Sequence, residues 1–233
     1  MLNASEIAIG SASASLTADF VQSLRAEILA GARLPGERVP LEALRQTYGI
    51  SLSPIREGLS RLVAEGLLIP VGQRGYRVAP ISINEFIDIK ALRVDLELKA
   101  LSASIRHGGE IWELDLMAAF QRLRNFEQKR WLSDEVDAWE ARHHAFHSTL
   151  IGACQSPILM RFCASLHDMG DRYRRLFLKT YEPDRNVTQE HQAMYQAAAD
   201  RNVDVACEVL RGHIERTGEN VLKLMREREG FGL

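Results

Sequence analysis

Apolar residues follow a helical period at three places in the first third of the chain and an alternating period at two places after them. The predicted helices cover residues 17–30, 41–48 and 53–66, and the predicted strands cover residues 67–71 and 76–79. Ser53 can cap the third helix, with Pro54 at its first position, where the missing N–H costs nothing. A tip with two glycines, Gly72 and Gly75, separates the strands. Three helices and a hairpin in this order predict a winged helix-turn-helix.

From Pro80 onward, every apolar pattern is helical. Residues 82–85 (Ser-Ile-Asn-Glu) form a capping box that opens a long helix. Its apolar stripe is Ile87, Ala91, Val94, Leu98, Leu101 and Ile105. Further helices are predicted over residues 110–128, 134–153, 157–181, 187–200 and 203–226. The fold class is therefore mainly α: an N-terminal winged helix-turn-helix followed by a C-terminal antiparallel all-helical bundle.

Composition and cysteine content place the chain among soluble globular proteins. Of 233 residues, 46% are apolar and 26% are charged, which allows one or two domains. We expect a flexible tail over residues 1–15, which are rich in Ala and Ser, a DNA-binding domain over 16–79 and a helical domain over 80–233. Three cysteines without a CxxC motif, no secretory signal and no apolar run long enough for a membrane span predict a cytoplasmic protein with no membrane partner.

Charge by region favours DNA binding by the first domain. Residues 16–80 carry eight Arg, no Lys and six Asp or Glu, whereas the whole chain has a formal net charge of -2. The N-terminus of the 53–66 helix offers free N–H groups to phosphate, and the glycine-flanked hairpin tip can approach a groove closely. The candidate DNA contacts are Ser51, Ser53, Arg56, Gln73, Arg74 and Gly75. Each feature alone is an ordinary capped helix or hairpin, and it is their order that indicates a DNA-binding domain.

Four histidines of the second domain are candidates for a shared site. His143 and His147 are four residues apart and share one helix face, while His191 and His213 lie on the last two predicted helices. Imidazoles that converge inside a bundle can hold a transition metal. On spacing alone, a single pair of histidines four residues apart more often lies on the protein surface and belongs to no site.

The first domain resembles the winged-helix domain of GntR-family regulators over residues 16–80. The motifs that carry the resemblance are Leu34-Pro35-Gly36-Glu37, Tyr48-Gly49-Ile50-Ser51, Ser53-Pro54-Ile55-Arg56-Glu57-Gly58-Leu59, Arg61-Leu62, Glu65-Gly66-Leu67 and Arg74-Gly75-Tyr76-Arg77-Val78. The family often has Arg where this chain has Glu42 and Leu52. Both arginines commonly help to contact DNA, so the operator cannot be inferred from relatives.

The second domain resembles the FCD effector domain of the FadR-like branch over residues 83–220. The resemblance lies in Leu92-Arg93 with Leu96-Glu97, Phe146-His147, Glu190-His191 and Arg211 with His213-Ile214. Many members bind a divalent metal through an Asp and three His. The three His correspond to His147, His191 and His213, and His143 stands at the Asp position.

The histidine at position 143 affects both the metal and its ligand. Four neutral imidazoles leave the ion's full charge uncompensated, which favours an anionic effector. They also favour a divalent transition metal, zinc or nickel above all. An alternative stays open: the site has lost its metal, and the histidines bind a carboxylate directly.

Arg93 is predicted to meet the effector, as the corresponding residue tends to do in relatives. Its alternative role is a surface ion pair with Glu97. The Asp171-Arg172-Tyr173-Arg174-Arg175 segment provides a further effector-binding candidate, Arg172, and two of its three arginines are expected to face solvent. Residues 156–175 resemble a subgroup of carbon-starvation and glutarate-pathway repressors, which implies a small carboxylate effector, a dicarboxylate or a hydroxy acid.

These observations predict a transcriptional regulator, expected to be a repressor, that binds a roughly palindromic double-stranded DNA operator as a homodimer. No catalytic residue is assigned. The alternative from another class is a metal-dependent hydrolase with a His-rich site and Glu190 as its base. No HExxH, nucleophile motif or phosphate loop supports it. A second alternative is a winged helix that binds protein.

Overall fold

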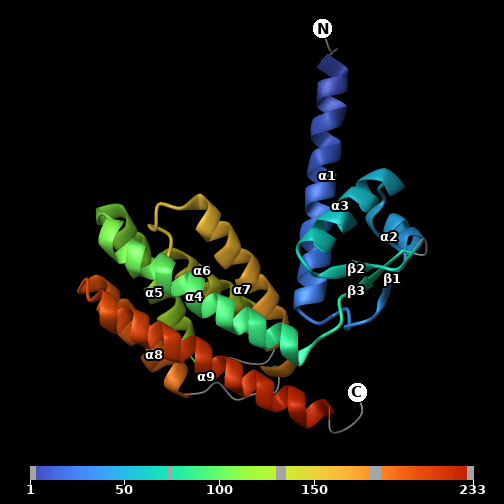
Figure 1. Cartoon of the computed structure of the whole chain (residues 1–233). Coiled ribbons are helices and arrows are strands. Elements are labelled where there is room, and N and C mark those ends of the chain that lie inside the picture. The colour runs from blue at the N-terminus through green and yellow to red at the C-terminus, as the bar shows by residue number, and fades with distance from the viewer. Residues whose placement is uncertain (1–3, 73–74, 130–134, 179–184, 230–233) are drawn as a thin grey trace. The chain divides into compact units, whose positions relative to one another are not determined.

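The structure is a computed structural model that describes residues 4–72, 75–129, 135–178 and 185–229 (Figure 1). Side chains are described from residue 16 onward, apart from a few positions at the ends of these ranges. The chain divides into two compact units, Met1–Ser82 and Ile83–Leu233. None of the described helices is both long and apolar enough to cross a membrane.

The first unit is a winged helix-turn-helix. Its helices are α1 (Ala4–Leu29), α2 (Leu41–Tyr48) and α3 (Leu52–Ala64), and its strands are β1 (Arg38–Val39), β2 (Leu68–Pro70) and β3 (Tyr76–Val78). The strands form an antiparallel sheet in the order β1-β3-β2. Gly49, in the left-handed region at φ 65°, ends α2. The predicted helices, turn and hairpin are all present.

Helices α1 and α3 pack closely to form the core of this unit. Phe20 and Leu24 from α1 are buried with Leu59 and Leu62 from α3. A Cβ atom on Gly58 would lie only 2.8 Å from the Phe20 ring. The close approach of the two helices therefore depends on the absence of a side chain at position 58.

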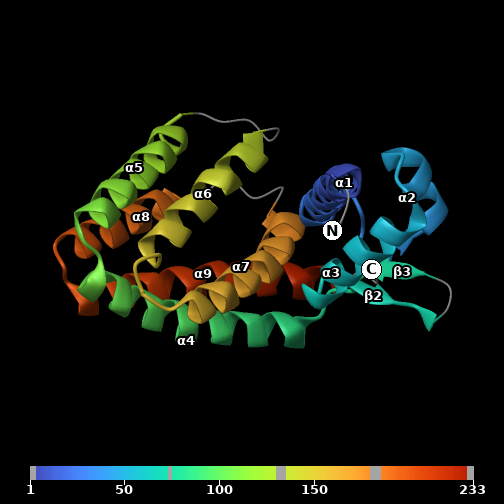
Figure 2. The same ribbon diagram turned by 90° about the horizontal axis from the view of Figure 1, so that it is seen from above.

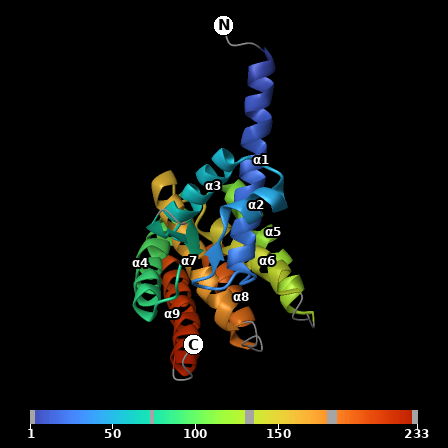
Figure 3. The same ribbon diagram turned by 90° about the vertical axis from the view of Figure 1, so that its right-hand side faces the viewer.

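Two helix starts differ from the prediction. Helix α1 begins at Ala4, so it runs through the segment that we expected to be a flexible tail, and its first turns extend beyond α2 and α3 (Figure 3). Alanine has the highest helix propensity, and no proline interrupts this segment. Helix α3 begins at Leu52 with Ser51, not Ser53, as its N-cap. Pro54 is tolerated within the first turn, because the N–H groups there have no partner inside the helix.

Strand β1 was not predicted. It contains two residues, and Arg38 and Val39 pair with Arg77 and Tyr76 of β3. Two residues are too few to show an alternation of apolar and polar side chains, so only the pairing with β3 defines this strand.

The second unit is an all-helical bundle (Figure 2). Its helices are α4 (Ile83–His107), α5 (Glu110–Glu127), α6 (Val136–Leu150), α7 (Pro157–Leu178), α8 (Arg185–Ala199) and α9 (Val203–Glu229). Helix α4 packs against α7 and α9, while α5 packs against α6 and α8. The predicted helices agree with these in number and order within the described residues.

Helix α4 buries a different face in its first half from the predicted one. Ile87 is 39% exposed, whereas Phe86 and Ile89 are buried in a small core with α7 and α9. Of the predicted stripe, Val94, Leu101 and Ile105 are buried in a larger core, and Leu98 is partly buried against it. Both stripes are apolar, so the spacing alone did not show which one meets the neighbouring helices.

Candidate metal centre and anion pocket

The four predicted histidines converge inside the second unit. His143 and His147 project from α6, His191 from α8 and His213 from α9, and all four are buried. One ring nitrogen from each lies within 4.8 Å of the others. Zinc–nitrogen bonds are about 2.0–2.1 Å long, so a bound ion would draw the rings slightly closer together. The helices therefore bring together the four histidines that were singled out from the sequence.

Two glutamates orient two of the rings, and sequence reasoning missed this role in both. Glu127 Oε1, at the end of α5, lies 2.9 Å from Nδ1 of His191. Glu190 Oε2 lies 2.8 Å from Nδ1 of His213 and also pairs with Arg216. A carboxylate on one ring nitrogen fixes the orientation of the ring and leaves the other nitrogen for a metal.

Several imidazole nitrogens have no hydrogen-bond partner within the described part of the chain. They are Nδ1 of His143, both ring nitrogens of His147 and Nε2 of His191, and all are buried. An unsatisfied buried polar group costs about 1–3 kcal/mol. Such groups fit a bound ligand.

Burial favours the form of these rings that binds metal. It lowers the pKa values of His143, His147 and His213 well below that of free histidine, and the neighbouring imidazoles lower them further. These three rings are therefore neutral at pH 7. Neutral imidazoles are ligands that fit a divalent transition metal.

His167 of α7 is a fifth buried imidazole beside this cluster. Its ring centroid lies 6.2 Å from that of His143 and 6.4 Å from that of His147, and its Nε2 has no hydrogen-bond partner among the described residues. Burial lowers its pKa, and the charges of Arg93 and Arg174 lower it further. This residue was not among the histidines singled out from the sequence.

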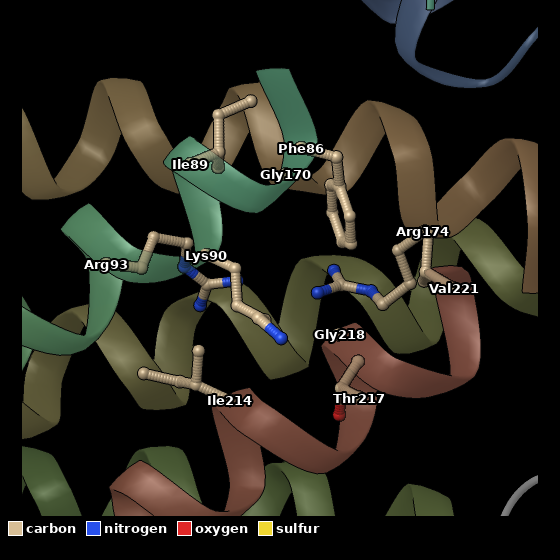
Figure 4. Close-up of a pocket in the computed structure, with 10 residues that line it drawn as sticks. All are labelled: Phe86, Ile89, Lys90, Arg93, Gly170, Arg174, Ile214, Thr217, Gly218 and Val221. Atoms are coloured by element: carbon tan, nitrogen blue, oxygen red, sulfur yellow. The ribbon is translucent and has the colours of Figure 1, made fainter. Parts of the chain in front are cut away.

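An open cavity lies between α4, α7 and α9, and its space of about 320 Å³ includes solvent at the mouth. It is lined by Phe86, Ile89, Lys90, Arg93, Gly170, Arg174, Ile214, Thr217, Gly218 and Val221. In Figure 4 the side chains of Lys90, Arg93 and Arg174 point toward the same space. The lining contains these three cations and no carboxylate, so the cavity suits an anion.

Each cation is held by a carboxylate outside the cavity. Arg93 Nε donates to Glu97 Oε1 at 2.7 Å, and Glu97 is only 2% exposed, so this pair is buried rather than the surface pair considered from sequence. Lys90 pairs with Glu219. A Cβ on Gly218 would lie 2.3 Å from Cδ of Lys90, so this glycine makes room for the lysine side chain.

The burial of the three arginines in the 171–175 segment differs from our expectation. Arg172 and Arg174 are buried and Arg175 is largely so, whereas we expected two of the three to face solvent. Arg174, and not Arg172, lines the cavity. The guanidinium of Arg172 lies 5.5 Å from the centre of the Tyr173 ring. Helix α7 turns different faces toward the bundle at consecutive residues, so a run of arginines could not show which one reaches the cavity.

The metal candidates and the cavity are neighbours. His213 directly precedes Ile214, a lining residue, on α9. Burial lowers the pKa of His213 most, and His191 lowers it further. The charges of Arg93 and Arg174 add to this effect. The two sites are therefore close together in the bundle.

Among the DNA-binding candidates that the structure describes, the three at the start of α3 are exposed and Gly75 is partly exposed. Ser51, Ser53 and Arg56 are exposed at the N-terminus of α3, and the Ser51 side chain makes no capping hydrogen bond. Gly75 has a φ of 112°, a conformation that suits glycine. Gln73 and Arg74 lie outside the described residues.

Two sequence families match the chain. "Bacterial regulatory proteins, gntR family" matches residues 16–78, and "FCD domain" matches residues 88–216. The HTH-type transcriptional repressor GlaR of Escherichia coli (strain K12) is 33% identical over 84% of this chain and 91% of its own length. BphR of Paraburkholderia xenovorans (strain LB400), an uncharacterized HTH-type transcriptional regulator, is 37% identical over 91% of this chain and 87% of its own length.

Solved structures share the fold. E. coli McbR/YncC has a TM-score of 0.72 at 18% identity and covers 91% of this chain and 98% of that chain. A GntR family member from Pseudomonas syringae pv. tomato str. DC3000 has a TM-score of 0.57 at 24% identity and covers 94% and 89%. These families and relatives are transcriptional regulators and not enzymes, which argues against the hydrolase alternative. The chain belongs to the GntR family and is a DNA-binding transcriptional regulator with an FCD effector domain.

Proposed function

We propose that this regulator is a repressor whose affinity for DNA is controlled by a small carboxylate that binds in the FCD domain beside a divalent metal. The observation that carries the proposal is the position of a cavity lined by three cations next to four buried histidines. The name of the relative GlaR, a repressor, favours repression.

In this proposal, different residues hold the metal, bind the carboxylate and orient the imidazole rings. His143, His147, His191 and His213 hold the metal, which would supply positive charge for a carboxylate ligand. Arg93 and Arg174 bind the carboxylate from the cavity side. Glu127 and Glu190 fix two rings and offset part of the ion's charge, so the site is less positive than four imidazoles alone would leave it.

The effector class follows from the charge of the lining. A ligand that meets Lys90, Arg93 and Arg174 gains most if it carries a second polar or anionic group, as a dicarboxylate or a hydroxy acid does. Glu190 is held by His213 and Arg216, so it is poorly placed to act as the free base that a hydrolase would need.

DNA recognition is proposed to use two copies of the chain on a roughly palindromic operator. Ser51, Ser53 and Arg56 would contact the major groove or its phosphates, and Gln73, Arg74 and Gly75 would contact the DNA through the wing. Because the two equilibria are linked, an effector that weakens DNA binding is itself bound more weakly by the DNA complex, by the same factor.

Arg56→Ala is expected to weaken DNA binding without unfolding the domain, because this exposed side chain supports no core contact. A lost guanine contact would cost about 1–3 kcal/mol, and a lost phosphate contact would reduce the salt slope by about one. Fluorescence anisotropy over a salt series, with a duplex selected by the purified protein, measures both. Arg61→Ala is the matched control, because Arg61 lies at the other end of α3 and pairs with Glu57. Equal binding by Arg56→Ala and wild type would show that the recognition surface lies elsewhere.

Arg93→Gln is expected to weaken effector binding about tenfold to a hundredfold, because a hydrogen bond to a charged group contributes about 1.5–3 kcal/mol. Thermal shifts with succinate, glutarate, adipate and malate identify a binding acid, and calorimetry then measures its affinity. Arg172→Gln is the matched control: it removes a buried arginine of the same domain that does not line the cavity. Loss of affinity in Arg172→Gln with none in Arg93→Gln would move the effector site away from this cavity.

A further inference from the structure

We propose that Glu140 is a positioning residue shared by the metal centre and the anion pocket, so that a carboxylate bound to Arg174 makes His143 a stronger metal ligand. This inference rests on the proposed function, since it needs both a metal on the histidines and an anion in the cavity. It adds a route by which filling one site alters the other.

Glu140 lies between the two sites. It is buried on α6, about one turn before His143. Arg174 Nε donates to its Oε1 at 3.0 Å, and Arg174 Nη2 donates to its Oε2. The same Oε2 lies 3.9 Å from Nδ1 of His143, which is too long for a hydrogen bond. The carboxylate is therefore held by the pocket arginine within an ångström or so of reaching the histidine.

His143 lacks the partner that two other ligands have. His191 and His213 each have a glutamate oxygen within hydrogen-bond distance of Nδ1. Nδ1 of His143 is buried without a hydrogen-bond partner within the described residues. A metal on the other nitrogen would leave the proton on Nδ1, where it needs an acceptor. Glu140 is placed to become that acceptor.

Arg174 can release Glu140 because it has another anionic partner. Its Nη2 also donates to Asp171, so its charge stays paired when Glu140 leaves. Figure 4 shows the guanidinium end of Arg174 pointing into the cavity. A carboxylate there competes with Glu140 for the same charge. The weakened pair lets Glu140 accept from His143, which orients the ring and raises its basicity toward the metal.

The coupling between the acid and the metal is expected to be positive. An acid in the cavity raises metal affinity, and by linkage the metal raises the affinity for the acid by the same factor. Removing an outer carboxylate commonly lowers metal affinity about tenfold to a hundredfold, and couplings between sites are commonly about 5-fold to 150-fold. Effects of this size are measurable on the intact protein.

The experiment measures Ni²⁺ affinity by competition with a chromogenic chelator, with and without whichever of succinate, glutarate, adipate or malate shifts the wild-type melting temperature most. We expect the acid to raise wild-type Ni²⁺ affinity at least about 5-fold. With the acid present, Glu140→Gln should bind Ni²⁺ about tenfold to a hundredfold more weakly than wild type, and its Ni²⁺ affinity should no longer respond to the acid. Glu127→Gln is the matched control: it should lower Ni²⁺ affinity with and without the acid and keep the response.

A second variant tests the role of Glu140 even if Glu140→Gln does not fold. Arg174→Lys keeps the charge but loses the two-point contact, so Glu140 should be partly released. Its Ni²⁺ affinity without acid should then exceed that of wild type. A normal acid response in Glu140→Gln, or an unchanged Ni²⁺ affinity in both variants, would overturn the role of Glu140. If the wild type binds no Ni²⁺ or responds to none of the four acids, the proposed function fails first, and the coupling fails with it.

Discussion

Removing the guanidinium of Arg174 is expected to destabilise the FCD domain by about 3–5 kcal/mol, the usual cost of leaving a buried charge without its partner. Arg174 is buried and bonds both Glu140 and Asp171. Burial raises the pKa of Glu140, although Arg174 opposes the shift. For Asp171, burial is outweighed by Arg174 and Arg175, and its pKa is lowered. Without Arg174, both carboxyl groups would lie in a poorly solvated site with less compensating charge.

Urea unfolding of Arg174→Met, followed by circular dichroism, measures this loss. The matched control is the triple variant Arg174→Met, Glu140→Gln, Asp171→Asn, which removes the charges together and should recover much of the stability. Arg175→Met should cost less, because its other partner, Asp137, is 73% exposed on its side chain. An unfolding midpoint of Arg174→Met equal to that of wild type would show that this network contributes little to stability.

Replacing His147 with leucine is expected to nearly empty the proposed metal centre while leaving the metal-free domain at least as stable as wild type. A structural zinc site contributes about 10–16 kcal/mol, or about 3 kcal/mol for each of four ligands, so affinity should fall about 100-fold. Both nitrogens of His147 are buried without a hydrogen-bond partner in the described chain. Leucine removes that cost, and no carboxylate loses a partner.

Thermal unfolding with and without Zn²⁺ separates the two effects, because a ligand stabilises only the protein that binds it. Zinc should raise the melting temperature of wild type and leave that of His147→Leu nearly unchanged. His107→Leu, at an exposed position, is the control. If zinc stabilises neither wild type nor the control, the histidines hold no metal, and the alternative of direct carboxylate binding by imidazole gains support.

The predictions from sequence were correct where the information is local. The order of three helices and a hairpin identified the winged helix-turn-helix, because capping residues, left-handed glycines and helical spacing act over a few residues. The clustering of His143, His147, His191 and His213 was also expected, but through the resemblance to a family, since spacing alone favoured a surface role for the pair on α6.

The predictions from sequence were wrong where two orientations of a helix have the same pattern of residues. The first half of α4 has two apolar stripes, and only packing against α7 and α9 decided that Phe86 and Ile89, rather than Ile87, are buried. The run of arginines on α7 had the same ambiguity. A rotation of a helix by one residue changes which side chain enters a cavity and leaves the spacing unchanged.

The partners of the site residues were decided by tertiary structure alone. Glu127 and His191 are 64 residues apart, and Glu140 and Arg174 are 34 apart. A glutamate on a helix is normally a solvated surface residue, and nothing in its neighbourhood along the chain marks it as buried. Sequence determined which helices form and which ligand types they carry. The packing of those helices determined which carboxylates are desolvated beside an imidazole or an arginine, because desolvation and charge pairing depend on distance in space and not along the chain.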